Sequence, residues 1–247
     1  MTAYAAGLFP AAQRRIRVIR QPPETPVTFA SQADAFLEPR QRMVDSQLRS
    51  RGIRDDRILR AMSRVPRHEF VEERHHSQAY EDHPLPIGFG QTISQPYIVA
   101  LMLEALAIKP ADIVLEIGTG SGYLTAILAE LAARVYSIER HSALAHLAER
   151  TLARLGYTNV IVTVGDGSHG MPNAAPFDDI IVSAAAPQIP SSLVQQLREG
   201  GRMIVPIGPS HAQVLQLVHK QAGKVQTISL EGCRFVPLIG EEGFPND

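Results

Sequence analysis

The chain has 247 residues, of which 45% are hydrophobic and 20% are charged, with a formal net charge of −1. This balance gives no electrostatic reason to expect nucleic acid or an anionic membrane surface as a partner. No apolar run approaches the roughly 20 residues that cross a bilayer. The single cysteine, Cys233, excludes an internal disulfide and favours the reducing cytoplasm. Its late apolar surroundings indicate a packing residue rather than a nucleophile.

The first 40 residues predict a flexible leader, because prolines and scattered polar residues dominate them. No positive charge precedes the mildly apolar first ten residues, which is the wrong order for a secretory signal. Four arginines follow instead, at positions 14, 15, 17 and 20. They could contact nucleic acid or a membrane, but a solvated tail is the simpler interpretation.

Residues 41–107 predict a helical cap followed by a lid loop. Apolar residues recur at helical spacing from about residue 41 to Pro66, with a break near Gly52. Residues 88–94 have the composition of a glycine-punctuated loop. Helix resumes at Gln95-Pro96 and continues to about Ala107, because proline is tolerated in the first helical turn.

Strands and helices then alternate through residues 108–210, which predicts parallel strand pairing with helices on both faces. The expected strands are 113–117, 134–138, 159–164, 178–184 and 201–207, and the expected helices are 122–132, 142–155 and 190–198. Within the last segment, 211–247, two alternating runs around Gly223 indicate an antiparallel β-hairpin at the sheet edge. Residues 41–247 therefore form one α/β domain, a Rossmann-like doubly wound and mostly parallel sheet.

The most informative local pattern extends from Val114 to Leu124, where a buried strand enters a turn containing Gly118, Gly120 and Gly122. Such a turn leaves bare backbone N–H groups beside a space that no side chain fills, which suits a nucleotide-like cofactor. Alone, the pattern is equally consistent with a tight turn. Glu139 ends the next strand, at the distance expected of an acid that accepts ribose hydroxyls, and this favours a cofactor site.

Asp166, between two glycines, follows the third predicted strand. The carboxyl ends of neighbouring parallel strands meet at one edge of the sheet, where ligands bind if the strand order reverses. Asp166 could accept a hydrogen bond from an adenine amino group, or it could be a turn aspartate. Its convergence with the two other strand ends favours the ligand.

The spacing of the glycines argues against a dinucleotide. In the dinucleotide pattern G-x-G-x-x-G the third glycine comes one residue later than Gly122, where this chain has Tyr123. The run after Glu116 instead resembles the first motif of class I S-adenosylmethionine-dependent methyltransferases, with Glu139 as the ribose-binding acid.

Further segments narrow this resemblance. In chain order they are Gly90-Gln91-Thr92-Ile93-Ser94-Gln95-Pro96, Val164-Gly165-Asp166-Gly167, residues 177–187, Leu197-x-x-Gly200-Gly201-Arg202 and Phe235-Val236-Pro237-Leu238. Together they closely resemble the protein-L-isoaspartate O-methyltransferase family over roughly residues 42–237. Ser183 departs from the pattern, since many members have glycine there.

The resemblance implies methyl transfer from S-adenosylmethionine to the free carboxylate of L-isoaspartyl and D-aspartyl residues in damaged proteins, which initiates repair through a succinimide. A carboxylate is already ionised near pH 7, so positioning and exclusion of water matter more than a base. The alternatives are a class I methyltransferase for another acceptor, a small-molecule carboxylate or RNA, and a silent adenosyl-binding module. The Asn/Asp-Pro-Pro-Tyr signature of base methylation is absent, and the motif residues Ser94, Glu139 and Asp166 are present.

By the same resemblance Ser94 is catalytic, its hydroxyl orienting the substrate carboxylate, although Ser94 could also cap the helix that begins at Gln95. Thr92, Ile93, Gln95 and Val236 are the expected substrate contacts, and Val236 is equally well explained as part of a core strand. The expected cofactor contacts are Glu116, Gly118, Thr119, Gly120, Gly122, Glu139, Arg140, His141, Asp166 and Gly167.

Two of these contacts have a stated expectation of their own. Glu116 is expected to order the glycine turn through backbone N–H groups. His141 either flanks the adenosyl group or simply begins a helix.

The nine histidines have no metal-ligand spacing, so no metal is expected. The expected protein is a cytoplasmic monomer whose partners are isoaspartyl proteins and peptides.

Overall fold

The computed structural model describes residues 35–245. Most of the predicted leader lies outside the described residues. Helix α1 (Leu37–Met43) begins three residues before the expected end of that leader, so the boundary predicted at residue 40 is wrong. Arg40 and Met43 of α1 are buried, which explains why the helical cap begins earlier than the sequence pattern indicated.

The helical cap breaks where predicted. α1 continues through a π turn (Val44–Leu48) and a 3₁₀ turn (Arg49–Arg51) to Gly52, whose φ of 102° lies in the left-handed region that favours glycine. Helix α2 (Asp56–Arg64) follows, capped by the Asp55 side chain, which accepts a hydrogen bond from the Arg57 N–H. Two 3₁₀ turns complete the cap, Arg67–Phe70 and Glu73–Gln78.

The segment predicted as a glycine-punctuated loop is instead a short hairpin. Strand β1 (Leu85–Gly88) pairs antiparallel with β2 (Gln91–Ile93). Phe89 and Gly90 between them have φ values of 52° and 70°, the left-handed pair that a two-residue hairpin turn requires. Strands this short carry almost no periodic signal, which is why the loop prediction was wrong. We call residues 85–93 the lid hairpin.

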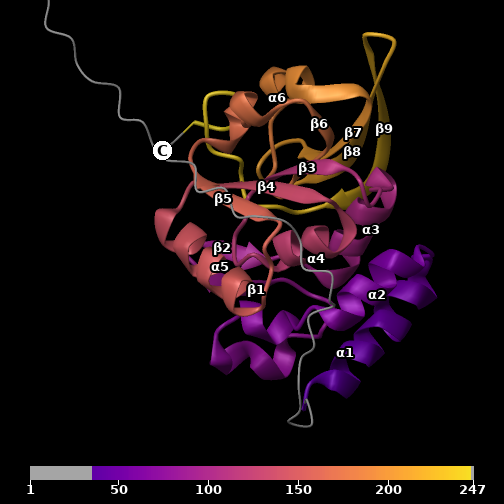
Figure 1. Cartoon of the computed structure of the whole chain (residues 1–247), viewed down its shortest axis with the longest axis vertical. Helices are drawn as coiled ribbons and strands as arrows, with labels where there is room; N and C mark the ends of the chain where they lie inside the picture. Colours follow the sequence, from indigo (N-terminus) through magenta and orange to yellow (C-terminus); the bar gives the residue numbers. More distant parts are fainter. Residues whose placement is uncertain (1–34, 246–247) are drawn as a thin grey trace, which may run out of the picture.

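The main sheet confirms the predicted doubly wound architecture (Figure 1). Its strands are β3 (Ile113–Ile117), β4 (Arg134–Glu139), β5 (Val160–Val164), β6 (Phe177–Val182), β7 (Leu197–Ile207), β8 (Gln213–Gln221) and β9 (Lys224–Cys233). Their order is β5-β4-β3-β6-β7-β8-β9. The first five strands in this order pair in parallel, and β8 and β9 are added antiparallel at the edge. The strand order reverses beside β3.

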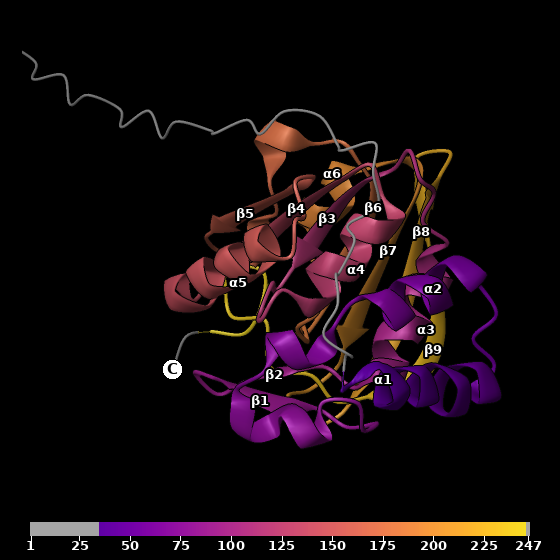
Figure 2. The same ribbon diagram turned by 60° about the horizontal axis from the view of Figure 1, so that its bottom comes forward.

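Helices cover both faces of this sheet (Figure 2). They are α3 (Pro96–Leu106), α4 (Tyr123–Leu131), α5 (Ser142–Arg154) and α6 (Ser191–Gln196). Val114 of β3 packs into the larger core with α3, α4, α5 and the helical cap, whereas its neighbour Leu115 packs into a second core with Leu193 of α6. Successive strand residues thus serve opposite faces. Within residues 35–245, no helix is long and apolar enough to cross a bilayer.

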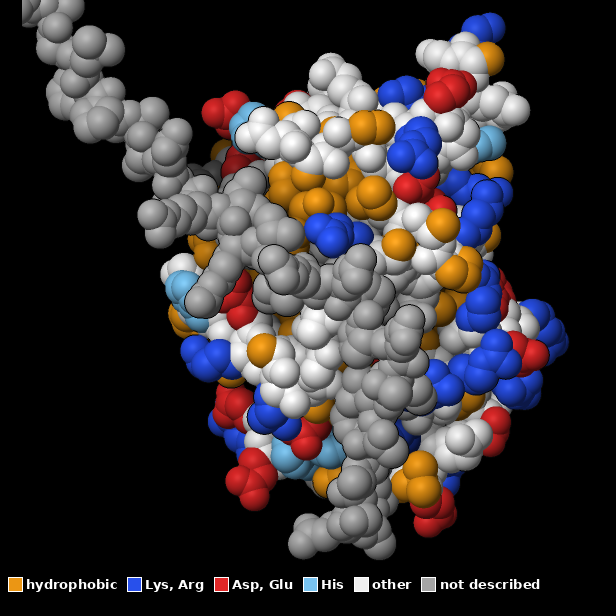
Figure 3. All heavy atoms as spheres, in the orientation of Figure 1, with side chains coloured by type: hydrophobic (Ala, Val, Ile, Leu, Met, Phe, Trp, Pro, Cys, Tyr) orange, Lys and Arg blue, Asp and Glu red, His pale blue; other side chains and the backbone are white. Residues whose placement is uncertain are grey.

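On the face drawn in Figure 3, lysine and arginine side chains gather along the side where α2 lies, with acidic side chains among them. Arg57 of α2 is paired with Asp55 at 2.5 Å, and Arg64 approaches Glu130 at 3.6 Å. This surface therefore mixes both signs of charge.

Candidate active site

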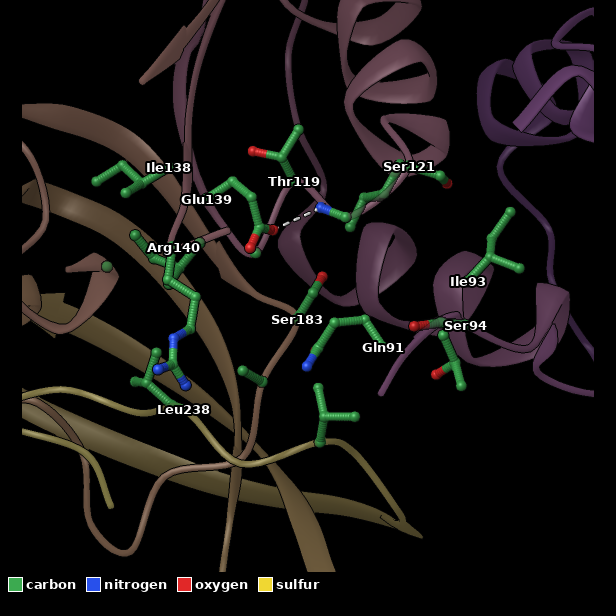
Figure 4. A pocket seen from close by; sticks show the side chains of 18 of the residues that line it. Gln91, Ile93, Ser94, Thr119, Ser121, Ile138, Glu139, Arg140, Ser183 and Leu238 are labelled. Carbon is green, nitrogen blue, oxygen red and sulfur yellow. Dashed lines mark hydrogen bonds between the residues drawn. The ribbon is translucent and has the colours of Figure 1, made fainter. Parts of the chain in front are cut away.

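A cavity opens at the carboxyl ends of β3, β4 and β6, where the strand order reverses and open α/β sheets bind ligands (Figure 4). It holds about 780 Å³ of empty space, open solvent at its mouth included. Its lining residues are Gln91, Thr92, Ile93, Ser94, Val99, Ile117, Gly118, Thr119, Gly120, Ser121, Tyr123, Leu124, Ile138, Glu139, Arg140, Gly167, Ser183, Ala184, Val236, Pro237, Leu238 and Ile239. We call this space the ligand cavity.

Glu139 and the glycine turn are in direct contact in the wall of this cavity. One carboxylate oxygen of Glu139 accepts from the Gly120 N–H at 2.9 Å, the contact dashed in Figure 4, and the other accepts from the His141 N–H at 2.9 Å. Glu139 is only 5% exposed, so these two backbone donors fix its orientation. A carboxylate has about four acceptor positions, which leaves two for the hydroxyls of a diol.

Glu116 does not bind the backbone of the glycine turn, so that prediction was wrong. It is fully buried beneath the turn and does not line the ligand cavity. One of its oxygens accepts from the Thr125 and Ser137 hydroxyls, each at 2.6 Å, and Thr119 of the turn reaches the network only through Ser137 at 2.5 Å. Burial raises the pKa of Glu116 to about 8, against the lowering effect of the two hydroxyls. Glu116 is therefore a neutral structural acid at pH 7.

Gly122 also lies outside the ligand cavity. It precedes α4 with a φ of 92°, and a Cβ there would lie 3.2 Å from the Cβ of Ala148 and 3.4 Å from Leu152. Its lack of a side chain thus permits α4 to pack closely on α5 rather than admitting a ligand. Gly118, Thr119 and Gly120 do line the cavity, as predicted.

Ser94 follows the lid hairpin and lines the ligand cavity, near Gln91 and Ile93 (Figure 4). The alternative that it caps a helix is wrong, because α3 begins at Pro96 and Gln95 is its N-cap residue. Asp82 accepts from the Tyr97 N–H at 3.2 Å instead. In the part of the chain that the structure describes, no hydrogen bond of the Ser94 hydroxyl is found.

Gln95 was expected to line the cavity but does not. Its side-chain amide donates to Asp82 at 2.8 Å, which directs it away from the cavity. Thr92 and Ile93, by contrast, are lining residues as predicted. Thr92 and Ile93 belong to the lid hairpin, whereas Gln95 lies after it, at the start of α3.

Of the neighbouring residues Arg140 and His141, only the first reaches the ligand cavity. Arg140 lines the ligand cavity, whereas His141 is outside the lining. The imidazole of His141 stacks on the ring of Phe89 at the tip of the lid hairpin, with 5.5 Å between the ring centroids. His141 therefore contacts the lid, and its position just before α5 also fits the helix-start alternative.

Asp166 fits the turn alternative that the sequence analysis held open. One of its oxygens accepts from the N–H and the hydroxyl of Ser168, each at 2.8 Å, and the other accepts from the Glu241 N–H at 3.0 Å. Burial acts to raise its pKa, but these hydrogen bonds hold the pKa of Asp166 below its usual value. Asp166 is not a lining residue, so the structure does not bring its side chain to the cavity.

The next residue, Gly167, does reach the cavity. A Cβ at Gly167 would lie 2.4 Å from the Ile117 side chain, so only glycine lets the 3₁₀ turn after β5 approach the end of β3 this closely.

The last wall of the ligand cavity comes from the C-terminal segment. Val236 and Leu238 pair with Ala185, whose N–H donates to the Val236 carbonyl at 2.8 Å and whose carbonyl accepts from the Leu238 N–H at 2.7 Å. This pairing brings Val236 into the lining, as expected, together with residues 237–239, which the sequence analysis did not assign. Their apolar character gave no local signal of a site.

Other lining residues also went unassigned, among them Gln91, Ser121, Ile138 and Ser183. Ser183 ends the strand next to β3 and could have been found from its position at the switch point. Among the described residues, no group of three or more His, Cys, Asp or Glu side chains is arranged to hold a metal ion.

Comparisons with known proteins agree on one family. The sequence model of protein-L-isoaspartate(D-aspartate) O-methyltransferase matches residues 38–243. A protein-L-isoaspartate O-methyltransferase of Koribacter versatilis is 59% identical over 209 residues, covering 85% of this chain and 94% of the relative. One from Methanoculleus marisnigri is 53% identical over 216 residues, covering 87% of this chain and 98% of the relative.

Solved structures give the same result. A protein-L-isoaspartate O-methyltransferase superposes with a TM-score of 0.76 at 33% identity, covering 83% of this chain and 67% of its own. A Plasmodium falciparum protein assigned to the same activity, in complex with S-adenosyl-L-homocysteine, superposes with a TM-score of 0.72 at 28% identity, covering 81% of this chain and 98% of its own.

Proposed function

The chain belongs to the protein-L-isoaspartate(D-aspartate) O-methyltransferase family, and from this membership we propose how its residues perform the reaction. The enzyme transfers a methyl group from S-adenosylmethionine to the free carboxylate of L-isoaspartyl and D-aspartyl residues in damaged proteins. The observation that carries the proposal is that Ser94, directly after the lid hairpin, and Glu139, from β4, line one cavity at the switch point.

The residues around the glycine turn fit the adenosyl group. Glu139 keeps free acceptor positions for the two ribose hydroxyls while Gly120 and His141 hold its carboxylate. The backbone of residues 118–120 lies along one side of the cofactor, and Arg140 and Gly167 flank it. When bound, S-adenosylmethionine supplies an electrophilic methyl group on a sulfonium centre.

Ser94 acts at the other end of the ligand cavity. Its hydroxyl, without a partner among the described residues, donates to one oxygen of the substrate carboxylate and directs the other toward the methyl group. The carboxylate is ionised near pH 7, so no side chain has to remove a proton. Thr92, Ile93 and Val236 line the same space and contact the peptide around the damaged residue. The lid excludes water, which would otherwise weaken these polar contacts.

The expected site residues that do not line the ligand cavity act by positioning the residues around them. Glu116 and Gly122 shape the glycine turn and α4, and Gln95 holds the start of α3 through Asp82. His141 contacts the lid tip, and Asp166 fixes the C-terminal segment.

We further propose that the enzyme is a cytoplasmic monomer that does not bind nucleic acid. The single cysteine and the mixed, largely paired charges near α2 support this. Light scattering after gel filtration checks the monomer, and a dimer mass would contradict it.

The decisive assay measures methyl ester formation, by methanol release, on an isoaspartyl peptide and on the matched normal aspartyl peptide. We expect activity on the first alone. Equal activity on both, or none on either, would overturn the assignment. Small carboxylates and RNA as acceptors test the alternative class, and turnover of either without turnover of the isoaspartyl peptide would favour it.

A further inference from the structure

We propose that Arg67 and Asp82 are positioning residues that hold Ser94 in its catalytic orientation by fixing its carbonyl and the residues that follow it. Both come from the N-terminal cap region and neither lines the ligand cavity. The inference rests on the proposed role of Ser94.

Arg67 lies at the centre of three elements. It is fully buried, and its guanidinium donates to the Ala79 carbonyl at 2.7 Å through Nε and to the Ser94 carbonyl at 2.7 Å through Nη2. Its guanidinium carbon lies 4.7 Å from the centroid of the Tyr123 ring, at the start of α4. Arg67 therefore joins the helical cap, the residue after the lid hairpin and the helix that follows the glycine turn.

A buried guanidinium is a costly way to fill this space. Removing a cation from water has a large desolvation penalty unless hydrogen bonds or an opposite charge offset it. Among the described residues no carboxylate lies within ion-pair distance of Arg67, and its Nη1 atom has no hydrogen-bond partner. Two carbonyls, the Tyr123 ring and the longer-range attraction of Asp82 therefore provide the compensation. An apolar side chain would avoid the penalty but could not hold the Ser94 carbonyl.

Asp82 fixes the residues that come directly after Ser94. One of its oxygens accepts from the Tyr97 N–H at 3.2 Å, and the other accepts from the Gln95 side chain at 2.8 Å and from Arg51 at 2.6 Å. Arg51 in turn lies over the Tyr97 ring, 3.3 Å from its centroid. Residues 95–97 are thus held by a second charged group.

Ser94 is thus anchored through its own carbonyl and through the residues that follow it, with its hydroxyl left for the substrate. Misplacing a reacting group by about 1 Å can cost about 100-fold in rate, so loosening either anchor should lower turnover. Cofactor affinity should change little, because Glu139 and residues 118–120 are held by β3 and β4 instead.

The test is a double-mutant cycle in the full-length chain. R67K and D82A are each made in the wild-type and the S94A background. R60K and D45A, which change exposed residues of the cap, serve as matched controls. S-adenosylhomocysteine titration counts binding sites, and kcat for the isoaspartyl peptide is expressed per site, so a loss of folded protein does not count as a loss of turnover.

We expect R67K and D82A to lower kcat per site by about tenfold or more in the wild-type background, and by less than about twofold in the S94A background. Equal fold losses in both backgrounds would overturn the inference, as would values that match R60K and D45A. If R67K binds no S-adenosylhomocysteine, the D82A cycle alone decides. A wild-type enzyme without isoaspartyl activity would instead refute the proposed function, so the two failures are distinguishable.

Discussion

Glu139 accepts a hydrogen bond from the Gly120 N–H at 2.9 Å, which joins the end of β4 to the middle of the glycine turn in the wall of the ligand cavity. The same carboxylate is expected to accept hydrogen bonds from the ribose hydroxyls, so Glu139 both stabilises the glycine turn and binds the cofactor.

Glu139→Ala should therefore weaken cofactor binding strongly. Losing hydrogen bonds to a charged group, at about 1.5–3 kcal/mol each, predicts a rise in the Kd of S-adenosylhomocysteine of about 100-fold. Isothermal titration measures this Kd, with Glu149→Ala on the exposed side of α5 as the control. An unchanged Kd would contradict the ribose assignment.

Ser94→Ala should lower turnover and leave the cofactor bound. Removing a single oriented donor from a reacting oxygen typically costs about 100-fold in kcat. Steady-state kinetics on an isoaspartyl peptide, together with the Kd of S-adenosylhomocysteine, separate the two effects, and Ser50→Ala at an exposed position is the control. A normal kcat for Ser94→Ala would remove Ser94 from the mechanism.

Glu116→Gln should fold as stably as the wild type at pH 7, because burial keeps the Glu116 carboxyl neutral and glutamine keeps an acceptor for both hydroxyls. Glu116→Ala should lose about 2–4 kcal/mol in the free energy of unfolding, since it leaves a void and unpaired hydroxyls. Urea unfolding compares the two variants. Equal losses in both would show that Glu116 is needed as a charge.

Asp179 should make stability depend on pH. Burial, with the neighbouring Asp112 carboxyl, raises the pKa of Asp179 from 3.8 to about 8. The folded state therefore keeps a proton that the unfolded state releases, and stability falls as the pH rises from about 4 to about 8, by at most about 1.4 kcal/mol per pH unit. Asp179→Asn should remove its share of this fall, whereas the share of Glu116, whose pKa is also raised to about 8, should stay.

Urea midpoints across that pH range, with exposed Asp56→Asn as the control, measure the effect. If wild type and Asp179→Asn keep parallel pH profiles, the shifted pKa is refuted.

Gly122→Ala should destabilise more than Gly223→Ala. Both glycines have positive φ, but only at Gly122 would a Cβ meet neighbouring side chains, with nothing within 4 Å at Gly223. We expect a loss of about 1 kcal/mol for Gly223→Ala and about 1–3 kcal/mol more for Gly122→Ala, by chemical unfolding. Equal losses would mean that the close packing of α4 on α5 contributes nothing.

The sequence by itself determined most strands of the parallel core and the order in which they follow one another. The last parallel strand is an exception, because β7 begins at Leu197, four residues before the expected strand 201–207 and inside the expected helix 190–198. The expected strand 113–117 coincides with β3, and the strand ending before Glu139 coincides with β4 to within one residue. Local information was sufficient there, because a buried strand is a continuous apolar run and a turn glycine is a local steric requirement.

The tertiary structure decided where the polar side chains point. Asp166 binds Glu241, 75 residues away, and Gln95 binds Asp82 rather than a substrate. Residue type and strand position do not specify these partners, since they depend on which segments the fold brings within 3 Å or so of each other. The anchoring of Ser94 by Arg67 is of the same kind, and for that reason it became visible only in the folded chain.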